Sequence, residues 1–481
     1  MKIRYGLVLA AAFGFGLTGC ASGGGGGGGG GNGPTGLAAA MSELSGEEGV
    51  PPSETENTNQ AQDLLESAED AEGSEAERLY QNALNAAQAE IDADPENPLG
   101  HRLAALAHLG LENYQQAGEH FDRAGELYPL YEMEDVQLRE EMWIELYNQG
   151  MPLINEGNYE AAAEVFEDAN AVYPHRPEAF ITLGQLYGQM RRHEDALENL
   201  ERGVEIVEDA DPEELGEETM AAWQDLTSNV PLLRAQILSD AGRFEEAAEI
   251  FARLREENPS DVSIAMNLAA TRLQTGDEAA AFAIYDEMLE DPALDLGPVQ
   301  YYQVGVGFYQ GSAYERATES FEEAVSANPM DRDGLEMWTR SLQLDSAYTE
   351  IPPVAERWAE LDPNSQAALL IHAQALNQQG DGAAAGQLVE QIDQLEVTVG
   401  ELQMLRFNQG GARVTGTVAN QQLEAGTQVT LTFTFYTTAG DPMGTVTETI
   451  SVGEPEMSEL FEVEFQSTEQ VGGYGYELSV G

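Results

Sequence analysis

Six histidines and one cysteine are the side chains of this protein best suited to metal binding or nucleophilic chemistry, and their spacing favours neither. No histidine forms an H-E-x-x-H pattern or pairs with the cysteine. His101 and His108 lie seven residues apart and can share a helix face, but such an isolated pair is more often a packing feature than a metal site. The full set is His101, His108, His120, His175, His193 and His372. We therefore expect no metal site.

The sequence also lacks complete motifs for calcium binding, nucleotide binding or hydrolase catalysis. Asp331-Arg332-Asp333-Gly334 resembles part of a calcium loop, but its register would place Pro329 first and Arg340 twelfth, which excludes an EF-hand. No phosphate-binding glycine pattern follows a predicted strand, and no serine or cysteine nucleophile motif occurs. Carboxylate pairs are too common in this chain to indicate a glycosidase. The chain is expected to be no enzyme and to need no cofactor.

The charge of the chain limits its partners. There are 86 acidic against 21 basic residues, for a formal net charge of −65, and Lys2 is the only lysine. Nucleic-acid binding needs a basic surface, so we expect none. An acidic surface for one partner and adaptation to a salty, halophilic medium both explain the excess. The acids are spread over the whole chain, and salt screens their repulsion, which favours the second interpretation.

The N-terminus has the pattern of an export signal. Lys2 and Arg4 precede a short apolar stretch from Tyr5 to Leu17, too short to span a bilayer comfortably. Leu17-Thr18-Gly19-Cys20 follows and resembles the bacterial lipobox. That resemblance implies a signal peptide at 1–19, cleavage before Cys20 and lipidation of this cysteine, with palmitate as one acyl chain. A free thiol near an ordinary secretory cleavage site is the alternative.

The residues after the cysteine favour a tethered protein. Ala21 instead of aspartate implies, by analogy with lipoproteins, the outer membrane of a diderm bacterium. Nine glycines, Gly23 to Gly31, and a polar stretch without periodicity follow. Such a segment cannot offset its ordering entropy, so residues 20–63 are expected to form a flexible linker. The chain would thus reach the membrane only through its lipid anchor.

A recurrence of 34 residues organises the next 336 positions. Tyr159, Ala162, Phe166, Ala169 and Pro174 form a frame that returns twice unchanged and once as a close variant. Repeats of this length are helix-turn-helix units that must stack to bury their apolar faces. The frame gives about nine repeats, at 64–97, 98–131, 143–176, 177–210, 228–261, 262–295, 298–331, 332–365 and 366–399. Insertions at 132–142 and 211–227 are expected to lengthen the first helix of the next repeat.

The frame resembles that of the tetratricopeptide repeat family. The resemblance implies a mainly α fold, an α-solenoid over residues 64–399 in which first helices line a concave groove at repeat positions 2, 5, 9, 12 and 13. Only four acidic residues fall on those positions, namely Glu178, Asp240, Asp333 and Glu336. Glutamines and apolar anchors are common there. The candidate groove residues are Tyr147, Met151, Gln185, Gln189, Gln236, Gln274, Tyr302, Tyr309, Gln310 and Gln374.

Near residue 400 the apolar period changes to two. Val429, Leu431, Phe433 and Phe435 alternate with polar residues, and Ala439-Gly440-Asp441-Pro442 marks a turn. This pattern predicts a small antiparallel β-sandwich at 400–481. Gly416 to Asn420, with Phe435-Tyr436 and Gly440, resembles the immunoglobulin-like accessory domains of bacterial envelope proteins.

Two functions of different classes remain open from the sequence. Amides beside rigid aromatic rings suit recognition of an extended peptide or a helix. The first hypothesis is a lipid-anchored scaffold that binds protein partners during assembly of an envelope complex. The second is capture of a cell-wall fragment, a polysaccharide or a small molecule for a transporter or enzyme. The greater burial of first helices would explain their low acidity equally well, and the oligomeric state is open.

Overall fold

The computed structural model of the protein describes residues 49–481. The predicted signal peptide, Cys20 and the glycine run lie outside the described residues. The linker was predicted to end at residue 63. This end is too late, because α2 (Glu56–Glu69) already begins at Glu56. Thr55 caps this helix: its side chain accepts from the backbone N–H of Thr58, whose hydroxyl bonds the Thr55 N–H in return. Ala61, Leu65 and Ala68 then give it a buried stripe.

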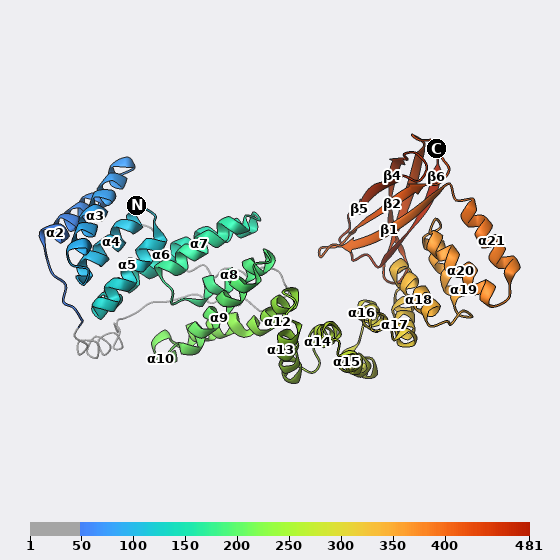
Figure 1. Ribbon diagram of the computed structural model, residues 1–481, viewed down its shortest axis with the longest axis horizontal. Helices are drawn as coiled ribbons and strands as arrows, with labels where there is room; N and C mark the ends of the chain where they lie inside the picture. Colours follow the sequence, from blue (N-terminus) through green and yellow to red (C-terminus); the bar gives the residue numbers. More distant parts are fainter. Residues whose placement is uncertain (1–48) are drawn as a thin grey trace, which may run out of the picture. The chain divides into compact units, whose positions relative to one another are not determined.

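The described chain is mainly helical and divides into two compact units. The first holds residues up to Gln149 with the short pieces 168–174 and 211–214, and the second holds the rest. Figure 1 shows the helices following one another in pairs, with all strands after the last helix. None of the helices in the described range is long and apolar enough to cross a membrane. The first unit is built from α2, α3 (Ser74–Ala93), α4 (Pro98–Gly110), α5 (Tyr114–Leu127) and most of α6 (Pro129–Asn155).

The second unit carries most of the repeats. Its helices are α7 (Tyr159–Val172, in part), α8 (Pro177–Gln189), α9 (His193–Asp209), α11 (Glu217–Ser228), α12 (Val230–Asp240), α13 (Phe244–Glu257), α14 (Val262–Gln274), α15 (Glu278–Glu290), η1 (Pro292–Leu294), α16 (Pro298–Gln310), α17 (Tyr314–Ala327), α18 (Arg332–Leu344), α19 (Ile351–Leu361), α20 (Gln366–Gln378) and α21 (Gly382–Asp393). The short α10 (Pro212–Leu215) lies where the units divide. The predicted solenoid of helical hairpins followed by a β region is confirmed.

Contacts between small and large residues explain the recurring spacing of the frame. In the hairpin of α16 and α17, Ala317, Phe321 and Ala324 are fully buried. A Cβ on Gly305 would lie 2.7 Å from the Phe321 ring, so only glycine lets the helices approach this closely. Gly150 stands in the same relation, also 2.7 Å, to Phe166. In these two hairpins one face of the first helix is therefore packed against its own second helix.

The two insertions behave differently. The segment 132–142 belongs to α6, a single helix of 27 residues, so the predicted lengthening is confirmed there. The segment 211–227 was expected to lengthen α12, and this prediction is wrong. It forms the separate helices α10 and α11. Gly216 has a φ of 82°, a conformation that breaks the helix before α11. Asn229 separates α11 from α12, and Pro231 sits in the first turn of α12, where a missing N–H is tolerated.

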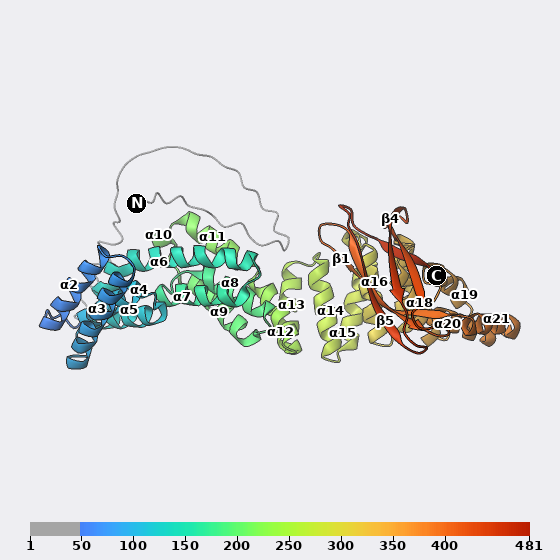
Figure 2. The same ribbon diagram turned by 90° about the horizontal axis from the view of Figure 1, so that it is seen from above.

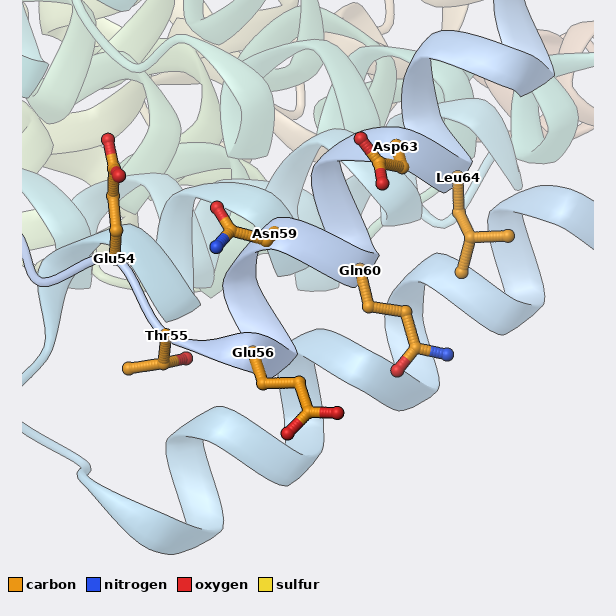
Figure 3. A pocket seen from close by; sticks show the side chains of 7 residues that line it. All are labelled: Glu54, Thr55, Glu56, Asn59, Gln60, Asp63 and Leu64. Atoms are coloured by element: carbon orange, nitrogen blue, oxygen red, sulfur yellow. The ribbon is translucent and has the colours of Figure 1, made fainter.

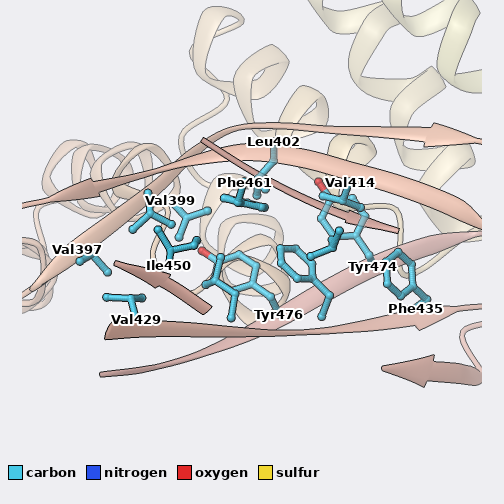
Figure 4. Close-up of a cluster of buried hydrophobic side chains, with 14 of the residues drawn as sticks. Val397, Val399, Leu402, Val414, Val429, Phe435, Ile450, Phe461, Tyr474 and Tyr476 are labelled. Atoms are coloured by element: carbon cyan, nitrogen blue, oxygen red, sulfur yellow. The ribbon is translucent and has the colours of Figure 1, made fainter. Parts of the chain in front are cut away.

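Six strands form two small antiparallel sheets. The strands are β1 (Val397–Arg406), β2 (Ala412–Asn420), β3 (Gln428–Tyr436), β4 (Pro442–Ser451), β5 (Ser458–Phe465) and β6 (Gly473–Val480). The sheets have the orders β1-β2-β5 and β4-β3-β6, so the β region begins three residues before the predicted boundary. Alternating residues of both sheets face each other in one core, which Figure 4 shows around Phe435, Phe461 and Tyr476. The predicted sandwich is confirmed.

A buried polar cluster attaches the sandwich to the last repeats. Asp362 ends α19, and its Oδ2 accepts bonds from Arg332 Nε at 3.1 Å and Nη2 at 2.8 Å. Its other oxygen accepts from the Tyr476 hydroxyl of β6 at 2.6 Å. The three residues are 1%, 7% and 4% exposed, so each polar group depends on the others for its partners. Both views place the strands beside α18 and α19 (Figure 2).

Backbone contacts complete this junction. The Asn328 Nδ2 donates to the Gly472 carbonyl at 2.8 Å, and the Val399 N–H donates to the Asn364 carbonyl at 3.2 Å. A Cβ on Gly473 would collide with the Met330 carbonyl oxygen. The sandwich and the repeats thus meet main chain to main chain, at a place where no larger residue fits.

We expect Gly473→Ala to loosen the junction, because the added methyl overpacks it at a cost of about 1–3 kcal/mol. The free energy of unfolding in urea should fall by that amount, and the amide of Val399 should exchange faster with deuterium. Gly386→Ala on α21 is the control, since a Cβ there meets nothing within 4 Å. Equal exchange of Val399 in both variants would contradict the account of the junction.

Candidate functional site

The first helices α14, α16, α18 and α20 share an uncovered side. Each contacts the next one in this order, so their surfaces are continuous within the second unit. None of the residues at repeat positions 2, 5, 9, 12 and 13 of these helices is buried. We call this set the open face. It comprises Ser263, Met266, Ala270, Leu273, Gln274, Val299, Tyr302, Val306, Tyr309, Gln310, Asp333, Glu336, Arg340, Gln343, Leu344, Ala367, Leu370, Gln374, Asn377 and Gln378.

Half of the candidate groove residues lie on the open face. Gln274, Gln310 and Gln374 are exposed there, and the two tyrosines Tyr302 and Tyr309 are half-buried. Three more, Gln185, Gln189 and Gln236, are exposed on α8 and α12, two first helices that contact each other earlier in the same unit. The structure therefore brings five candidates onto one surface and extends the pattern to a neighbouring pair of helices.

The two candidates from α6 are not part of the open face. The Tyr147 ring belongs to the first unit and stacks on Trp143 with centroids 4.9 Å apart, which gives it a packing role. Met151 belongs to the second unit and is half-buried on the last turns of α6.

The sequence prediction missed three apolar side chains on the open face. Val299, Leu344 and Leu370 are 52%, 48% and 55% exposed, more than most large apolar residues of the chain. They occupy repeat positions 2, 13 and 5 of successive first helices, and their signal was therefore present in the frame. Exposed apolar residues that recur on one face indicate an interaction site more than a single exposed residue does. Together with Met266, Leu273 and Val306, they make this face apolar over four helices.

Aromatic rings give the open face rigid points. Tyr302 packs on Phe321 with centroids 5.6 Å apart, and Tyr309 meets Tyr314 edge-on at 5.5 Å. Burial raises the pKa of Tyr302 to about 12, so its hydroxyl stays neutral at physiological pH. A ring held by its own repeat loses little conformational entropy when it contacts a partner.

The acidic side chains of the open face are paired. Glu336 accepts from Arg340 at 2.7 Å and from Arg332 at 2.5 Å, and Asp333 accepts from Arg332 at 2.9 Å. These residues account for both acids on the face. A surface without unpaired charge therefore exists in a chain of net charge −65.

Glutamine amides on neighbouring repeats reach one another across this face. The Gln343 Nε2 of α18 donates to the Gln374 Oε1 of α20 at 2.7 Å. Exposed glutamines also form the last residue of α14, α16 and α20, namely Gln274, Gln310 and Gln378. The open face thus combines apolar anchors, fixed rings and neutral amides.

A hollow at the N-terminal end of the first unit is a weaker candidate for a binding site. It measures about 760 Å³ and is lined by Glu54, Thr55, Glu56, Asn59, Gln60, Asp63 and Leu64. Figure 3 shows these side chains spread along α2 rather than directed at one point. The hollow is open to solvent and has three carboxylates, so it does not form an enclosed ligand site.

Three histidines cluster between α4 and α5 in the first unit. The Nδ1 atoms of His101 and His120 are 3.1 Å apart, and the His120 ring stacks on His108 at 5.5 Å. His101 Nε2 lies 3.2 Å from the Pro95 carbonyl oxygen. The parts of the chain that the structure describes contain no group of three or more His, Cys, Asp or Glu residues placed to hold a metal ion. Burial lowers the pKa of all three histidines, which favours their neutral forms where the rings pack together.

Comparisons with known proteins identify the repeats. A family model described as tetratricopeptide repeat matches residues 75–132 and 232–295, and a second model of that description matches residues 153–214. The chain thus contains tetratricopeptide repeats. The hairpins after residue 295 lie outside these segments, and they carry the Tyr314, Phe321 and Pro329 frame. No curated protein matches the chain in sequence.

Several solved structures match parts of the chain. One is described as a functional characterization of Pseudomonas aeruginosa pilF, with 16% identity, a TM-score of 0.33, and coverage of 49% of this chain and 99% of that one. A tetratricopeptide repeat protein from Parabacteroides merdae has 18% identity, a TM-score of 0.28, and coverage of 59% and 99%. YrrB, described as having an unusual peptide-binding site, has 18% identity, a TM-score of 0.26, and coverage of 43% and 92%.

The histidine cluster makes the first unit sensitive to acid. Burial, together with the neighbouring charges of His101 and His108, lowers the pKa of His120 to about 4. The unfolded chain binds this proton at about pH 6.5. The folded state therefore loses stability as the pH falls from about 6.5 to about 4.

We expect His120→Gln to lose part of that acid sensitivity. Without solvent screening, the pKa shift of His120 would change the free energy of unfolding by about 3 kcal/mol between the two pH values. Because the ring is only half-buried, solvent screening reduces this change to about 1–2 kcal/mol. Urea unfolding at a series of pH values, followed by hydrogen exchange in α4 and α5, measures the effect. His193→Gln on α9 of the second unit is the control. The expectation fails if both variants follow the wild-type pH dependence.

Proposed function

We propose that this protein is a non-enzymatic scaffold that binds polypeptide partners through the open face. The observation that carries the proposal is the presence of three exposed apolar side chains, Val299, Leu344 and Leu370, one on each of three successive first helices that also carry rigid tyrosines. Burying such groups is the main favourable term in association. Tetratricopeptide repeats are in general protein-interaction scaffolds, which supports this choice.

The capture of a small ligand has less support. A small-molecule site surrounds its ligand and directs a few polar groups at it. The open face instead extends over four helices, and the hollow at α2 is open with diverging side chains. Four helices at spacings of about 9 Å present a length of about 27 Å, which an extended peptide crosses with about eight residues. The dimensions favour a polypeptide.

We also propose that the scaffold is anchored in the cell envelope and helps to assemble a complex there. The support is the lipobox-like Leu17-Thr18-Gly19-Cys20 and the glycine run that follows it. Ala21 after the cysteine supports the outer membrane of a diderm bacterium. A tether of this kind would let the open face search for partners close to the membrane.

The sandwich is proposed to be an immunoglobulin-like accessory domain. The strand pairing supports this, because β1-β2-β5 corresponds to strands A, B and E, and β3 and β6 pair as strands C and F do. Its junction with α18 and α19 fixes it beside the open face, in the same unit. It would hold the last repeats in place and offer a second surface.

The polypeptide proposal predicts that Leu344→Ala with Leu370→Ala weakens peptide binding about tenfold or more, since two exposed anchors are lost. The probes are peptides of about 12 residues selected from a random displayed library on the immobilised full chain. Leu405→Ala with Leu460→Ala is a matched control, because these leucines of the sandwich are 61% and 83% exposed. Failure to enrich any peptide, or equal losses in both variants, would contradict the proposal.

The anchoring proposal predicts that Cys20→Ser abolishes membrane attachment. The wild-type chain, expressed in a diderm host, should incorporate labelled palmitate and sediment with the outer membrane, because several acyl chains hold a protein stably. The serine variant should do neither. A variant that still sediments with the membrane would show that another part of the chain attaches it.

A further inference from the structure

The last position of the repeat, directly before the next first helix, carries a capping residue in four of the repeats. Asn97, Asp261 and Ser365 accept a hydrogen bond through their side chains from the backbone at the start of α4, α14 and α20. Asp331 occupies the same position before α18. The repeats therefore place four polar residues in one structural position, where their surroundings can be compared.

Burial and charge are related in a simple way at three of these positions. Asn97 and Ser365 are 1% and 4% exposed, and neither side chain ionises. Asp261 can ionise, and it is exposed to solvent. This distribution is expected, because a carboxylate loses favourable hydration when it is buried. Asp331 is the exception, since it is an ionisable residue that is only 9% exposed.

The sandwich covers the turn that contains Asp331. The Gly472 carbonyl accepts from Asn328 Nδ2 at 2.8 Å, and a Cβ on Gly473 would lie 3.2 Å from the Asp331 nitrogen. A second sandwich loop reaches the same turn at Gly440, whose Cβ position is 3.5 Å from a side-chain carbon of the turn. The burial of Asp331 therefore follows from the docking of the sandwich on the last repeats.

The arginines of this junction have other partners. Arg332 donates to Asp362, and Arg406 of β1 donates to two main-chain carbonyls just before β6, both at 2.8 Å. Arg357 of α19 donates to the main chain of the turn at 3.4 Å. Within residues 49–481 the Asp331 carboxylate forms no ion pair. The docked sandwich thus covers a carboxylate that no cation contacts.

This environment favours the neutral form of Asp331. Burial raises the pKa of Asp331 to about 6, and the charge of Asp333 acts in the same direction. The backbone N–H groups at the start of α18 and the more distant Arg406 guanidinium oppose the shift without cancelling it. An aspartate that is exposed to water has an ordinary pKa of about 3.9. Docking therefore changes the proton affinity of this side chain.

The other groups that face this region behave differently. Tyr302 of α16 and Tyr474 of β6 stay neutral at physiological pH, because burial raises the pKa of both. The last turn of α17, residues 324–327, has no charged side chain. Burial also raises the pKa of Asp362, but the charge of Arg332 and a tyrosine hydroxyl oppose this shift. Asp362 keeps its cation in contact, whereas Asp331 has none.

We propose that the junction between the sandwich and the last repeats is an acid-strengthened contact, in which Asp331 takes up a proton from solvent when the sandwich docks. The docked state buries a neutral carboxyl group in acid and a charged one at alkaline pH. The contribution of Asp331 to docking is fully present below about pH 4 and is lost as the pH rises through about 6. At higher pH the sandwich is released more often from its place beside the open face. The inference does not depend on what that face binds.

Hydrogen exchange of the full chain between pH 5 and pH 8 tests the proposal, with each rate divided by the intrinsic exchange rate at that pH. The amide of Val399 reports docking, because it donates to the Asn364 carbonyl across the junction at 3.2 Å. The amide of Phe433, in the central strand β3, reports unfolding of the sandwich itself. A pKa difference of about two units makes the opening equilibrium of Val399 rise about tenfold from pH 5 to pH 8. Phe433 should stay protected.

Neutral variants at the same position identify the group that titrates. Asp331→Asn introduces the residue that the chain already buries as a cap at Asn97, and Asp331→Ser introduces that of Ser365. In both, the opening of Val399 should change by less than about twofold over this pH range. Asp261→Asn is the matched control and should keep the tenfold change, because Asp261 is exposed.

A wild-type junction whose opening is constant over this range, or rises as the pH falls, would overturn the inference. A tenfold rise that persists in the neutral variants would also overturn it, because another group would then carry the proton. If one neutral variant fails to fold, the other decides. The acid sensitivity of the first unit does not interfere, since it has the opposite sign and is measured on amides of α4 and α5.

Discussion

Close contact between a small residue on one helix and a large ring on the next is the constraint on which this structure depends. Gly305 against Phe321 and Gly150 against Phe166 leave no room for a side chain larger than hydrogen. The first helices α6 and α16 are therefore held closely against their own second helices, and Gly307 against Tyr285 holds α16 as closely against the preceding repeat. The opposite side of such a helix has no partner within the repeat, and stacking covers only its flanks. The open face is the side of the first helices that this packing leaves uncovered. Its residues are not needed for packing, so they are available to bind a ligand.

The junction with the sandwich uses a different interaction, a buried network instead of apolar contact. Arg332, Asp362 and Tyr476 satisfy one another where water has little access. Such a network adds little net stability compared with an apolar core, but removing one member leaves the others unpaired at high cost. It therefore selects one arrangement of the sandwich on α18 and α19. Asp333 and Glu336 of the open face bond the same arginine, so Arg332 connects the junction to the open face.

Much of this fold could be predicted because repeats enforce it. The spacing of Tyr314, Phe321 and Pro329 located helix ends, and the alternation in Val429 to Phe435 located a strand. The prediction that the insertion 211–227 lengthens α12 was wrong. The helix is interrupted by the positive φ of Gly216, and the spacing of apolar residues does not reveal a backbone conformation. The linker was drawn too long because the capping of α2 by Thr55 and Thr58 is a local signal inside a polar stretch. For the face, five candidates were located by the frame, yet the apolar Leu344 and Leu370 were overlooked. Exposure depends on the neighbouring repeat, which no single copy of the frame reveals.

The central claim is that polypeptides bind on the open face and not elsewhere on the molecule. Photo-crosslinking tests it most directly, with a selected peptide that carries a benzophenone and with mass spectrometry to locate the attached residues on the full chain. The account predicts attachment to first-helix residues of α14 to α20, foremost Tyr302, Leu344 and Leu370, and its loss when unlabelled peptide competes. Attachment confined to the second helices α15, α17 and α19, or to the exposed Leu405 and Leu460 of the sandwich, would contradict it.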